Sequence, residues 1–219
     1  DLRTLHAGGR PVASMLRCEI APQNGGDTMF SSTYAVYDSL SDGLKETLQS
    51  LNAFHTLLNT RCLVMTNRKP MNEKEVVKVE GALHPVVLVH PDTGRKCLYI
   101  SDQMTDHFDG WTVAESKPLI DYLCKQIEHP AFTYRHRWES GDVIMWDNRC
   151  TMHYAIGDYT SERVMQRVTV LGDARPVGAA PPAPHFGTRH LSSPSPCNAP
   201  HVRHSQRSGV PSSPSARPT

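Results

Sequence analysis

Apolar positions repeat with two different periods along the chain, which predicts a mixture of strands and helices. Apolar and β-branched residues crowd 11–20, and alternation returns late in the sequence in "FTYRHRWE", "DVIMWDN" and "RVMQRVTVLGD". These segments predict strands. Apolar residues at helical spacing predict one or two helices over 33–54 and an amphipathic helix over 114–129.

A hairpin is predicted between the two helical segments. Residues 84–101, "HPVVLVHPDTGRKCLYIS", contain an apolar run, a Pro-Asp-Thr-Gly turn and an alternating strand. Strands near both ends of the sequence enclose the helical part. This order predicts an α+β domain built on a β-sandwich or barrel.

The composition changes sharply at residue 178. From there to Thr219 the sequence holds nine of the 17 prolines and no Asp or Glu, and its apolar residues follow no period. Such a segment cannot offset the entropy of ordering, so it is predicted to be disordered. The sequence therefore divides into a folded domain, 1–177, and a Pro/Ser-rich tail, 178–219.

Charge and cysteine content exclude several classes of protein. A formal net charge of +1 over 219 residues argues against a nucleic-acid-binding protein. No stretch approaches the roughly 18 consecutive apolar residues of a membrane-spanning helix. Six scattered cysteines without a close pair predict reduced thiols in a cytoplasmic protein. The first residues show no secretory signal and no Met, which predicts that the chain begins inside a longer protein.

Two arginines near the end of the domain are candidates for anion binding. Alternation along the last predicted strand places Arg163 and Arg167 on one face and Val164, Val168 and Val170 on the other. The valine face is the expected core face. An exposed arginine face would be ordinary, but two guanidiniums two pleats apart could also clamp two small carboxylates or sulfonates.

A histidine close to these arginines suggests a metal. The segment 143–159, "VIMWDNRCTMHYAIGDY", predicts a strand that ends in a turn containing His153. A neutral imidazole beside an anion clamp suits a metal that the anion also coordinates. Non-haem Fe(II) oxygenases use two histidines and one carboxylate and leave the other positions open.

Four segments together resemble the taurine dioxygenase/2,4-dichlorophenoxyacetate dioxygenase family in order and spacing. They are "GGDTMF", "LHPVVLVHPDTGRKCLYIS", "MWDNRCTMHYAIGDY" and "RVMQRVTVLGD". The resemblance runs from Asp1 to Val177. It implies a double-stranded β-helix (jelly roll) with a helical insert that lacks the N-terminal part of the family's domain. It also implies dependence on Fe(II), 2-oxoglutarate and O2.

The resemblance assigns roles to seven residues in three groups. The implied iron ligands are Asp1 and His153, the 2-oxoglutarate contacts are Thr28 and Arg163, and the substrate contacts are Arg167, Tyr99 and Trp146. The family's His-x-Asp motif places the remaining iron ligand, a histidine, two residues before Asp1 and so outside this chain.

Two internal His-x-Asp triplets compete with that assignment. His90-Pro-Asp92 lies in the predicted hairpin turn, where both side chains are expected to face solvent. His107-Phe-Asp109 lies in a polar segment that is typical of a loop. Both follow "GGDT", which is the reverse of the family's order.

The expected function is that of an Fe(II)- and 2-oxoglutarate-dependent dioxygenase. It would hydroxylate a small organic anion (a sulfonate, sulfate ester or aryloxy-carboxylate) and release succinate and CO2. The alternative is a non-catalytic, anion-binding jelly-roll fragment that lacks one iron ligand. No nucleic-acid or membrane partner is expected. The sequence leaves the identity of the anion and homo-oligomerisation open.

Overall fold

The computed structural model describes residues 10–56, 81–172 and 177–179. The chain divides into two units, 1–183 and 184–219, and all the described residues belong to the first. Most of the predicted disordered tail therefore lies outside the described residues. Its first residues are part of the fold, because Gly178 pairs with Leu88 and Ala179 is buried.

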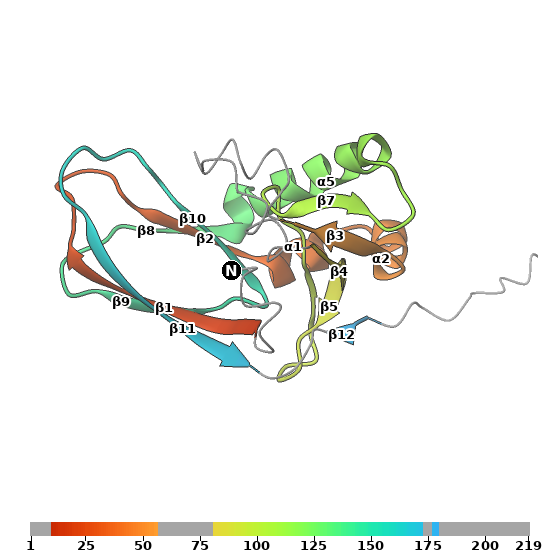
Figure 1. Ribbon diagram of the computed structural model, residues 1–219, viewed down its shortest axis with the longest axis horizontal. Coiled ribbons are helices and arrows are strands. Elements are labelled where there is room, and N and C mark those ends of the chain that lie inside the picture. Colours follow the sequence, from red (N-terminus) through yellow and green to blue (C-terminus); the bar gives the residue numbers. More distant parts are fainter. Residues whose placement is uncertain (1–9, 57–80, 173–176, 180–219) are drawn as a thin grey trace, which may run out of the picture. The chain divides into compact units, whose positions relative to one another are not determined.

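Two antiparallel three-stranded sheets face each other and frame the candidate site (Figure 1). We call them the β1 sheet and the β2 sheet after their central strands. The β1 sheet has the order β11-β1-β9, with β1 at Arg10–Ile20, β9 at Val143–Asp147 and β11 at Val164–Gly172. The β2 sheet has the order β10-β2-β8, with β2 at Thr28–Ser32, β8 at Thr133–His136 and β10 at Thr151–Ala155.

Two smaller sheets and the helices form the rest of the described fold. One sheet has the order β4-β3-β7, with β3 at Asn52–His55, β4 at Ala82–Pro85 and β7 at Thr105–Phe108. The other has the order β12-β5-β6, with β5 at Val87–Val89, β6 at Lys96–Leu98 and β12 at Val177–Gly178. The helices are α1 (Thr33–Ser39), α2 (Asp42–Gln49), α5 (Val113–Ile127) and the 3₁₀ helix η3 (Pro130–Phe132).

The predicted helices and the hairpin are confirmed, but the end of the helical span 33–54 is wrong, because residues 52–54 belong to strand β3. Helix α5 starts one residue earlier than predicted because Thr112 caps it. The Thr112 hydroxyl accepts from the backbone N–H of Glu115, and the Glu115 carboxylate accepts from the N–H of Thr112. This reciprocal capping box satisfies two amides that the first turn would otherwise leave unpaired.

The main hydrophobic core lies away from the space between the β1 and β2 sheets. Buried side chains of the helices and the small sheets form it, among them Val36, Leu48, Val87, Leu98, Phe108 and Leu123. Burial of each large side chain contributes about 1.5–3 kcal/mol. Because this cluster anchors the fold, the space between the two larger sheets can hold polar and aromatic side chains.

The prediction that the valine face of β11 packs in the core is wrong. Val168 and Val170 are 62% and 45% exposed, so this face points to solvent. In the register with β1, Arg167 lies opposite Leu16, and the next inward position of β1 is the fully buried Ser14. The arginine face therefore points between the sheets, where a site needs polar groups more than it needs apolar packing.

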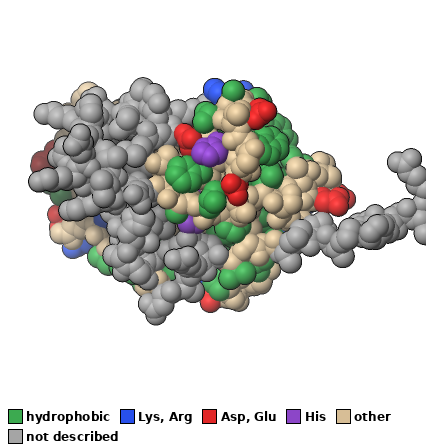
Figure 2. All heavy atoms as spheres, turned by 45° about the vertical axis from the view of Figure 1, so that its right-hand side comes forward, with side chains coloured by type: hydrophobic (Ala, Val, Ile, Leu, Met, Phe, Trp, Pro, Cys, Tyr) green, Lys and Arg blue, Asp and Glu red, His purple; other side chains and the backbone are tan. Residues whose placement is uncertain are grey.

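None of the described helices has both the length and the apolar character needed to span a bilayer. The face of the molecule shown in Figure 2 has a mixed surface, on which hydrophobic side chains are interspersed with acidic, histidine and uncharged ones.

Candidate functional site

His153 lies in a strand, and the prediction of a turn around it is wrong. It belongs to β10 and sits opposite Phe30 of β2 in the antiparallel register. The centre of its ring is 6.5 Å from that of Phe30 and 4.8 Å from that of Trp146, which comes from the facing β1 sheet. The imidazole therefore points into the space between the two sheets.

The surroundings of His153 favour its neutral form. Burial of the ring among protein atoms, aided by the positive charge of Arg167, lowers its pKa from 6.5 to about 4. The side chain still keeps an exposed surface, which weakens desolvation, but the arginine acts in the same direction. At neutral pH the ring nitrogens are therefore available to a metal without competition from a proton.

Arg167 faces the same space from β11. Its Nη2 donates to Ser14 Oγ at 3.0 Å, and its guanidinium carbon lies 5.8 Å from the centre of the Trp146 ring. The predicted substrate contacts Arg167 and Trp146 are therefore brought together beside His153.

Arg163 carries a buried nitrogen that no acceptor satisfies. Its Nε donates to the carbonyl of Gly26 at 3.0 Å, and its guanidinium lies over the Tyr159 ring at 5.6 Å. Nη2 is buried without a hydrogen-bond partner in the described structure. An unpaired buried donor is costly, so this nitrogen is suited to an anion that would supply the acceptor.

The close approach of Arg163 depends on a glycine. Gly26 has a φ of 71°, a conformation that residues with a Cβ rarely adopt. A Cβ there would lie 2.7 Å from Cγ of Pro22 and 3.1 Å from Cδ of Arg163. The second glycine of "GGDT" thus lets the arginine reach the backbone that precedes β2.

The hydroxyl of Thr28 accepts a hydrogen bond from a tryptophan, which leaves its own hydrogen available for donation. Thr28 is 2% exposed, and its Oγ1 accepts from Trp138 Nε1 at 2.9 Å. An indole N–H can only donate, so the hydroxyl hydrogen of Thr28 remains free for another acceptor. Trp138 was not predicted from the sequence as a site residue. It could have been found because a buried tryptophan needs an acceptor for its N–H.

Ion pairs and a hydrogen bond hold the "GGDT" segment in place on both sides. Arg135 Nε donates to Asp27 Oδ2 at 2.7 Å, and the backbone N–H of Gly26 donates to Asp158 Oδ1 at 2.8 Å. Arg135 also lies 3.5 Å from the Asp158 carboxylate. These contacts fix the backbone that carries Thr28 and receives Arg163.

The contacts of the described residues do not connect two predicted site residues with this group. Asp1 lies outside the described residues. Tyr99 stacks on the ring of His55, with 5.2 Å between centres, and meets the His84 ring edge-on at 5.6 Å. The proposed roles of Asp1 as an iron ligand and of Tyr99 as a substrate contact stay predictions.

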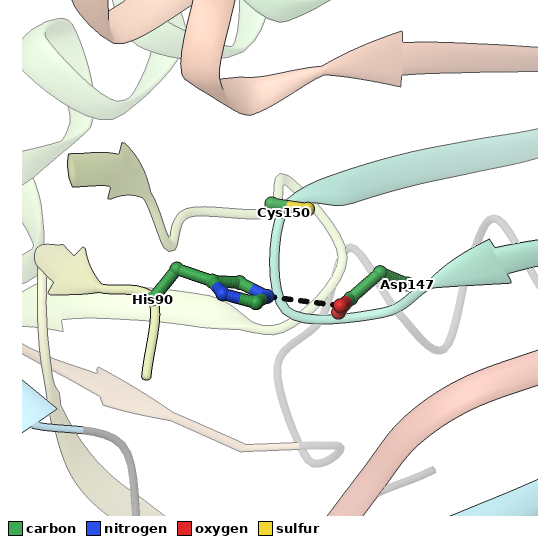
Figure 3. A group of neighbouring side chains, drawn as sticks. All are labelled: His90, Asp147 and Cys150. Carbon is green, nitrogen blue, oxygen red and sulfur yellow. Dashed lines mark hydrogen bonds and ion pairs between the residues drawn. The ribbon is translucent and has the colours of Figure 1, made fainter. Parts of the chain in front are cut away.

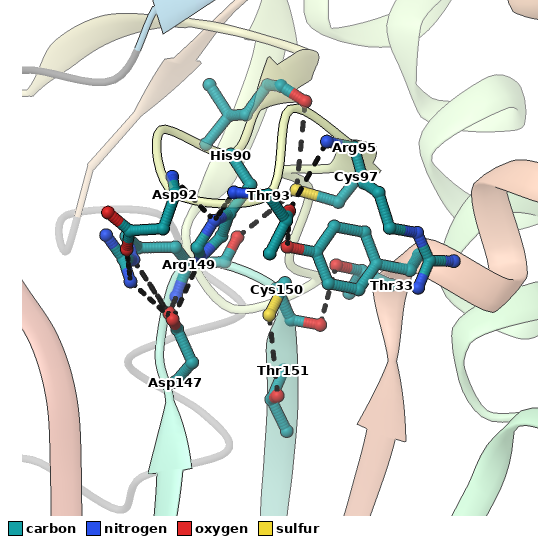
Figure 4. Close-up of polar contacts among 12 residues, drawn as sticks. Thr33, His90, Asp92, Thr93, Arg95, Cys97, Asp147, Arg149, Cys150 and Thr151 are labelled. Carbon is teal, nitrogen blue, oxygen red and sulfur yellow. Dashed lines mark hydrogen bonds and ion pairs between the residues drawn. The ribbon is translucent and has the colours of Figure 1, made fainter.

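The triplet His90-Pro-Asp92 belongs to a structural network, and the prediction that His90 faces solvent is wrong. His90 is 4% exposed, and its Nε2 lies 2.9 Å from Asp147 Oδ2 (Figure 4). Its Nδ1 accepts from the backbone N–H groups of Asp92 and Thr93 at 3.3 Å each. Because Nδ1 is an acceptor, Nε2 carries the proton and donates it to Asp147.

Arg149 completes this network. Its Nε and Nη2 contact the Asp147 carboxylate at 2.9 Å and 2.6 Å, and Nη2 also reaches Asp92 at 2.8 Å. Burial alone would raise the pKa of Asp147, but the bonds from Arg149 and His90 outweigh it and lower the pKa to about 2. The network ties the β5–β6 turn to the end of β9.

One ligand atom each of His90, Asp147 and Cys150 lies within 4.8 Å of the others, a spacing that could suit a metal (Figure 3). Two observations argue for a structural role instead. The guanidinium of Arg149 already contacts both oxygens of Asp147. Burial and the nearby charge of Asp147 raise the pKa of the Cys150 thiol, which disfavours the thiolate that would bind a metal.

Replacing Asp147 with asparagine should lower the free energy of unfolding by about 2 kcal/mol at pH 7. The folded-state pKa is depressed, so the stabilisation is complete above about pH 4 and is lost as the pH falls toward 2. Urea denaturation should therefore show that the free energies of unfolding of the wild-type protein and of Asp147→Asn become equal as the pH falls toward 2. Asp38→Asn is the control, because the exposed Asp38–Arg95 pair should contribute under about 1 kcal/mol. A difference in free energy of unfolding that does not change with pH would contradict a stabilising role of the ionised Asp147 carboxylate.

The second triplet, His107-Phe-Asp109, is also engaged elsewhere. His107 belongs to strand β7, so the prediction of a loop is wrong. Its Nδ1 lies 2.8 Å from Asp106 Oδ2, and its ring packs on Phe54 with 5.3 Å between centres. It belongs to the β4-β3-β7 sheet, whereas His153 belongs to the β2 sheet.

Comparisons with solved structures define the class of the fold. A taurine dioxygenase from Burkholderia xenovorans superposes with a TM-score of 0.65 at 34% identity, over 78% of this chain and 55% of that one. The crystal structure of AAD-2 in complex with Mn(II) and N-oxalylglycine gives a TM-score of 0.70 at 31% identity, over 77% and 67%. The sheet-rich fold is therefore that of the taurine-dioxygenase-like proteins.

Sequence comparison then identifies the family. The model of the taurine catabolism dioxygenase TauD, TfdA family matches residues 6–169, and the chain belongs to this family of non-haem iron oxygenases. It is 37% identical over 174 residues to an alpha-ketoglutarate-dependent sulfate ester dioxygenase of Pseudomonas putida. It is 36% identical over 160 residues to an alpha-ketoglutarate-dependent 2,4-dichlorophenoxyacetate dioxygenase of a Burkholderia species. These matches cover 77% and 73% of the chain but only 57% and 53% of those relatives, so it spans about half their length.

Proposed function

We propose that this protein is an Fe(II)- and 2-oxoglutarate-dependent dioxygenase that hydroxylates a small organic anion. One observation carries the proposal. Among the described residues, the Thr28 hydroxyl hydrogen and the buried Nη2 of Arg163 are two donors without acceptors at the same "GGDT" segment. Family membership indicates which anion would supply the acceptors, because the curated relatives depend on alpha-ketoglutarate (2-oxoglutarate).

In this proposal Arg163 and Thr28 bind the distal carboxylate of the 2-oxoglutarate molecule. The guanidinium supplies the charge and a hydrogen bond from Nη2, and the threonine adds a neutral donor. Trp138 keeps the threonine hydrogen turned toward the anion. The N-oxalylglycine complex of the similar AAD-2 structure supports the presence of such a ligand site in this fold.

His153 and Asp1 would hold the iron, together with the histidine that the family's motif places before Asp1. The neutral imidazole of His153 and the aromatic rings around it fit a metal ligand whose orientation must be fixed. With 2-oxoglutarate and O2, bound iron supplies the oxidant for hydroxylation of a C–H bond, and succinate and CO2 are released. The protein's own contribution is to hold the target carbon close to the metal.

The substrate would be a sulfonate, a sulfate ester or an aryloxy-carboxylate. Arg167 supplies the positive charge for its anionic group, and the rings of Trp146 and Phe30, 5.3 Å apart, offer an apolar wall. Tyr99 remains a further proposed contact. The reduced cysteines among the described residues, Cys18, Cys97, Cys124 and Cys150, fit the reducing cytoplasm, where we place the protein.

Succinate formation tests the proposal directly. The protein is incubated with Fe(II), 2-oxoglutarate and ascorbate, and with taurine, hexyl sulfate or 2,4-dichlorophenoxyacetate in turn. Succinate that rises with one of these anions supports the dioxygenase. Binding of both 2-oxoglutarate and anion without any succinate would favour the non-catalytic anion-binding protein instead.

Replacing Arg167 with alanine should uncouple the two half-reactions. We expect the apparent Michaelis constant for the anion to rise about tenfold or more, while that for 2-oxoglutarate changes little, because Arg163 remains in place. Succinate formed per hydroxylated product should increase, since 2-oxoglutarate then decays without a positioned target. The ratio is measured while each substrate is titrated. An equal shift of both titrations would refute the division of roles.

A further inference from the structure

A chain of hydrogen bonds through Ser14 and Asn148 links Arg167 to the indole of Trp146. Trp146 Nε1 donates to Asn148 Oδ1 at 2.9 Å, and Asn148 Nδ2 donates to Ser14 Oγ at 2.9 Å. Arg167 Nη2 donates to the same Ser14 oxygen at 3.0 Å. The chain crosses the β1 sheet from the end of β9, through β1, to β11.

The direction of each bond follows from the chemistry of the groups. The indole can only donate, so the oxygen of the Asn148 amide must face Trp146 and its NH2 group must face Ser14. A guanidinium can also only donate, so Ser14 Oγ accepts from Arg167 and from the Asn148 NH2 group, while its own hydroxyl donates to Asn148 Oδ1 at 3.3 Å. Ser14 is fully buried, so solvent does not compete for its oxygen.

We propose that Ser14 and Asn148 are positioning residues that strengthen binding of the anionic substrate by fixing the guanidinium of Arg167. One nitrogen of the guanidinium is tied to Ser14, and its remaining N–H groups are left for the substrate's anionic group. Asn148 keeps the serine oxygen in place and is itself oriented by Trp146. This inference rests on the role proposed above for Arg167.

The hydrogen bond from Arg167 to Ser14, which we call the tether, matters because an arginine side chain has many conformations. Arg167 is exposed as a whole, so without Ser14 its head could turn toward solvent or lie flat on Trp146. Substrate binding would then have to order it, which weakens affinity without altering charge. The contacts of Arg163 and Thr28 lie at a different segment and should not be affected.

The first test observes the tether itself. Nitrogen-15 NMR of the guanidinium groups, with the Arg167 signals assigned by Arg167→Lys, should show slowed rotation in the wild-type protein. Ser14→Ala should remove that slowing. Ser14→Cys, which nearly keeps the volume but accepts weakly, should reduce it even if the alanine variant folds poorly. Unchanged rotation in both variants would overturn the proposal.

The second test measures binding of hexyl sulfate and 2,4-dichlorophenoxyacetate by calorimetry. Ser14→Ala should weaken binding of the anion by about tenfold, measured with whichever of the two anions the wild-type protein binds. Binding of 2-oxoglutarate should be unchanged. In an Arg167→Ala background the same change should have no further effect, because Ser14 acts through the arginine. Additive losses in the double variant would refute the inference.

A matched control separates positioning from stability. Ser31 is also a buried serine, and its hydroxyl donates to the carbonyl of Ile127 at 2.6 Å, away from Arg167. Ser31→Ala should lower stability without weakening anion binding, and an equal loss of binding would overturn the proposal. If the wild-type protein binds neither anion, the proposed function fails, and the NMR measurement still decides whether Ser14 fixes Arg167.

Discussion

Replacing Arg163 with alanine should weaken 2-oxoglutarate binding by about 100-fold. Loss of a charge-assisted contact at a desolvated site typically costs on the order of 2–5 kcal/mol. The fold should tolerate the change, because the substitution removes one hydrogen bond to the Gly26 carbonyl and the contact with the Tyr159 ring, and it also removes a buried nitrogen without a partner in the described structure. Calorimetric titration with 2-oxoglutarate, alongside the thermal unfolding temperature, checks both expectations.

Two further variants make this result specific. Arg137→Ala removes the same charge from an exposed position just after β8 and should leave 2-oxoglutarate binding within about twofold. Arg163→Lys keeps the charge but loses the planar fork, so it should recover only part of the affinity. Normal 2-oxoglutarate binding by Arg163→Ala would exclude this arginine from the cofactor site.

The second large effect is expected at His153. His153→Ala should abolish succinate formation and strongly reduce metal affinity, because the imidazole is the described group that the proposal places on the iron. Mn(II) binding, followed by electron paramagnetic resonance, measures the metal site without turnover. Undiminished succinate formation in this variant would remove His153 from the mechanism.

His90 and His107 provide the comparison for His153. His107 lies in β7 beside Asp106, so His107→Ala should leave Mn(II) affinity unchanged. His90→Ala should destabilise the protein through loss of the Asp147 contact, yet the folded fraction should keep its metal affinity. Loss of metal from either variant, with His153→Ala unaffected, would reassign the ligands to an internal His-x-Asp pair.

Local patterns predicted many of the described helices and strands but missed several short strands, among them β3, β7 and β10, the strand that carries His153. The amphipathic period of α5 and the alternation of β1 are strong over many residues. Strand β10 has only five residues, "TMHYA", and three of them are exposed, so its pattern is weak. Pairing with β2 makes it a strand, and that pairing is a tertiary contact that no local signal shows.

The resemblance to the family supplied the predicted site residues, but it did not predict the residues that orient them. Arg167 and Trp146 lie beside His153, and Arg163 and Thr28 meet at the "GGDT" segment, while their roles in a site stay predictions. Ser14, Asn148 and Trp138 act through partners more than 100 residues away, with separations of 153, 134 and 110. Hydrophobicity also misassigned the faces of β11, because the rule that valines point inward fails where the interior is a polar site.

The central position of β1 in its sheet affects the order in which the protein can fold. Strand β1 is synthesised before both of its neighbours, β9 and β11, which lie more than 120 residues later in the chain. Until then β1 lacks the two strands with which it pairs in the described structure, and Met15 on its outer face adds an apolar side chain. Such non-local pairing slows folding and leaves the nascent chain open to aggregation. The anion site, which needs Ser14 and Arg167 together, can therefore form only when β11 closes the sheet.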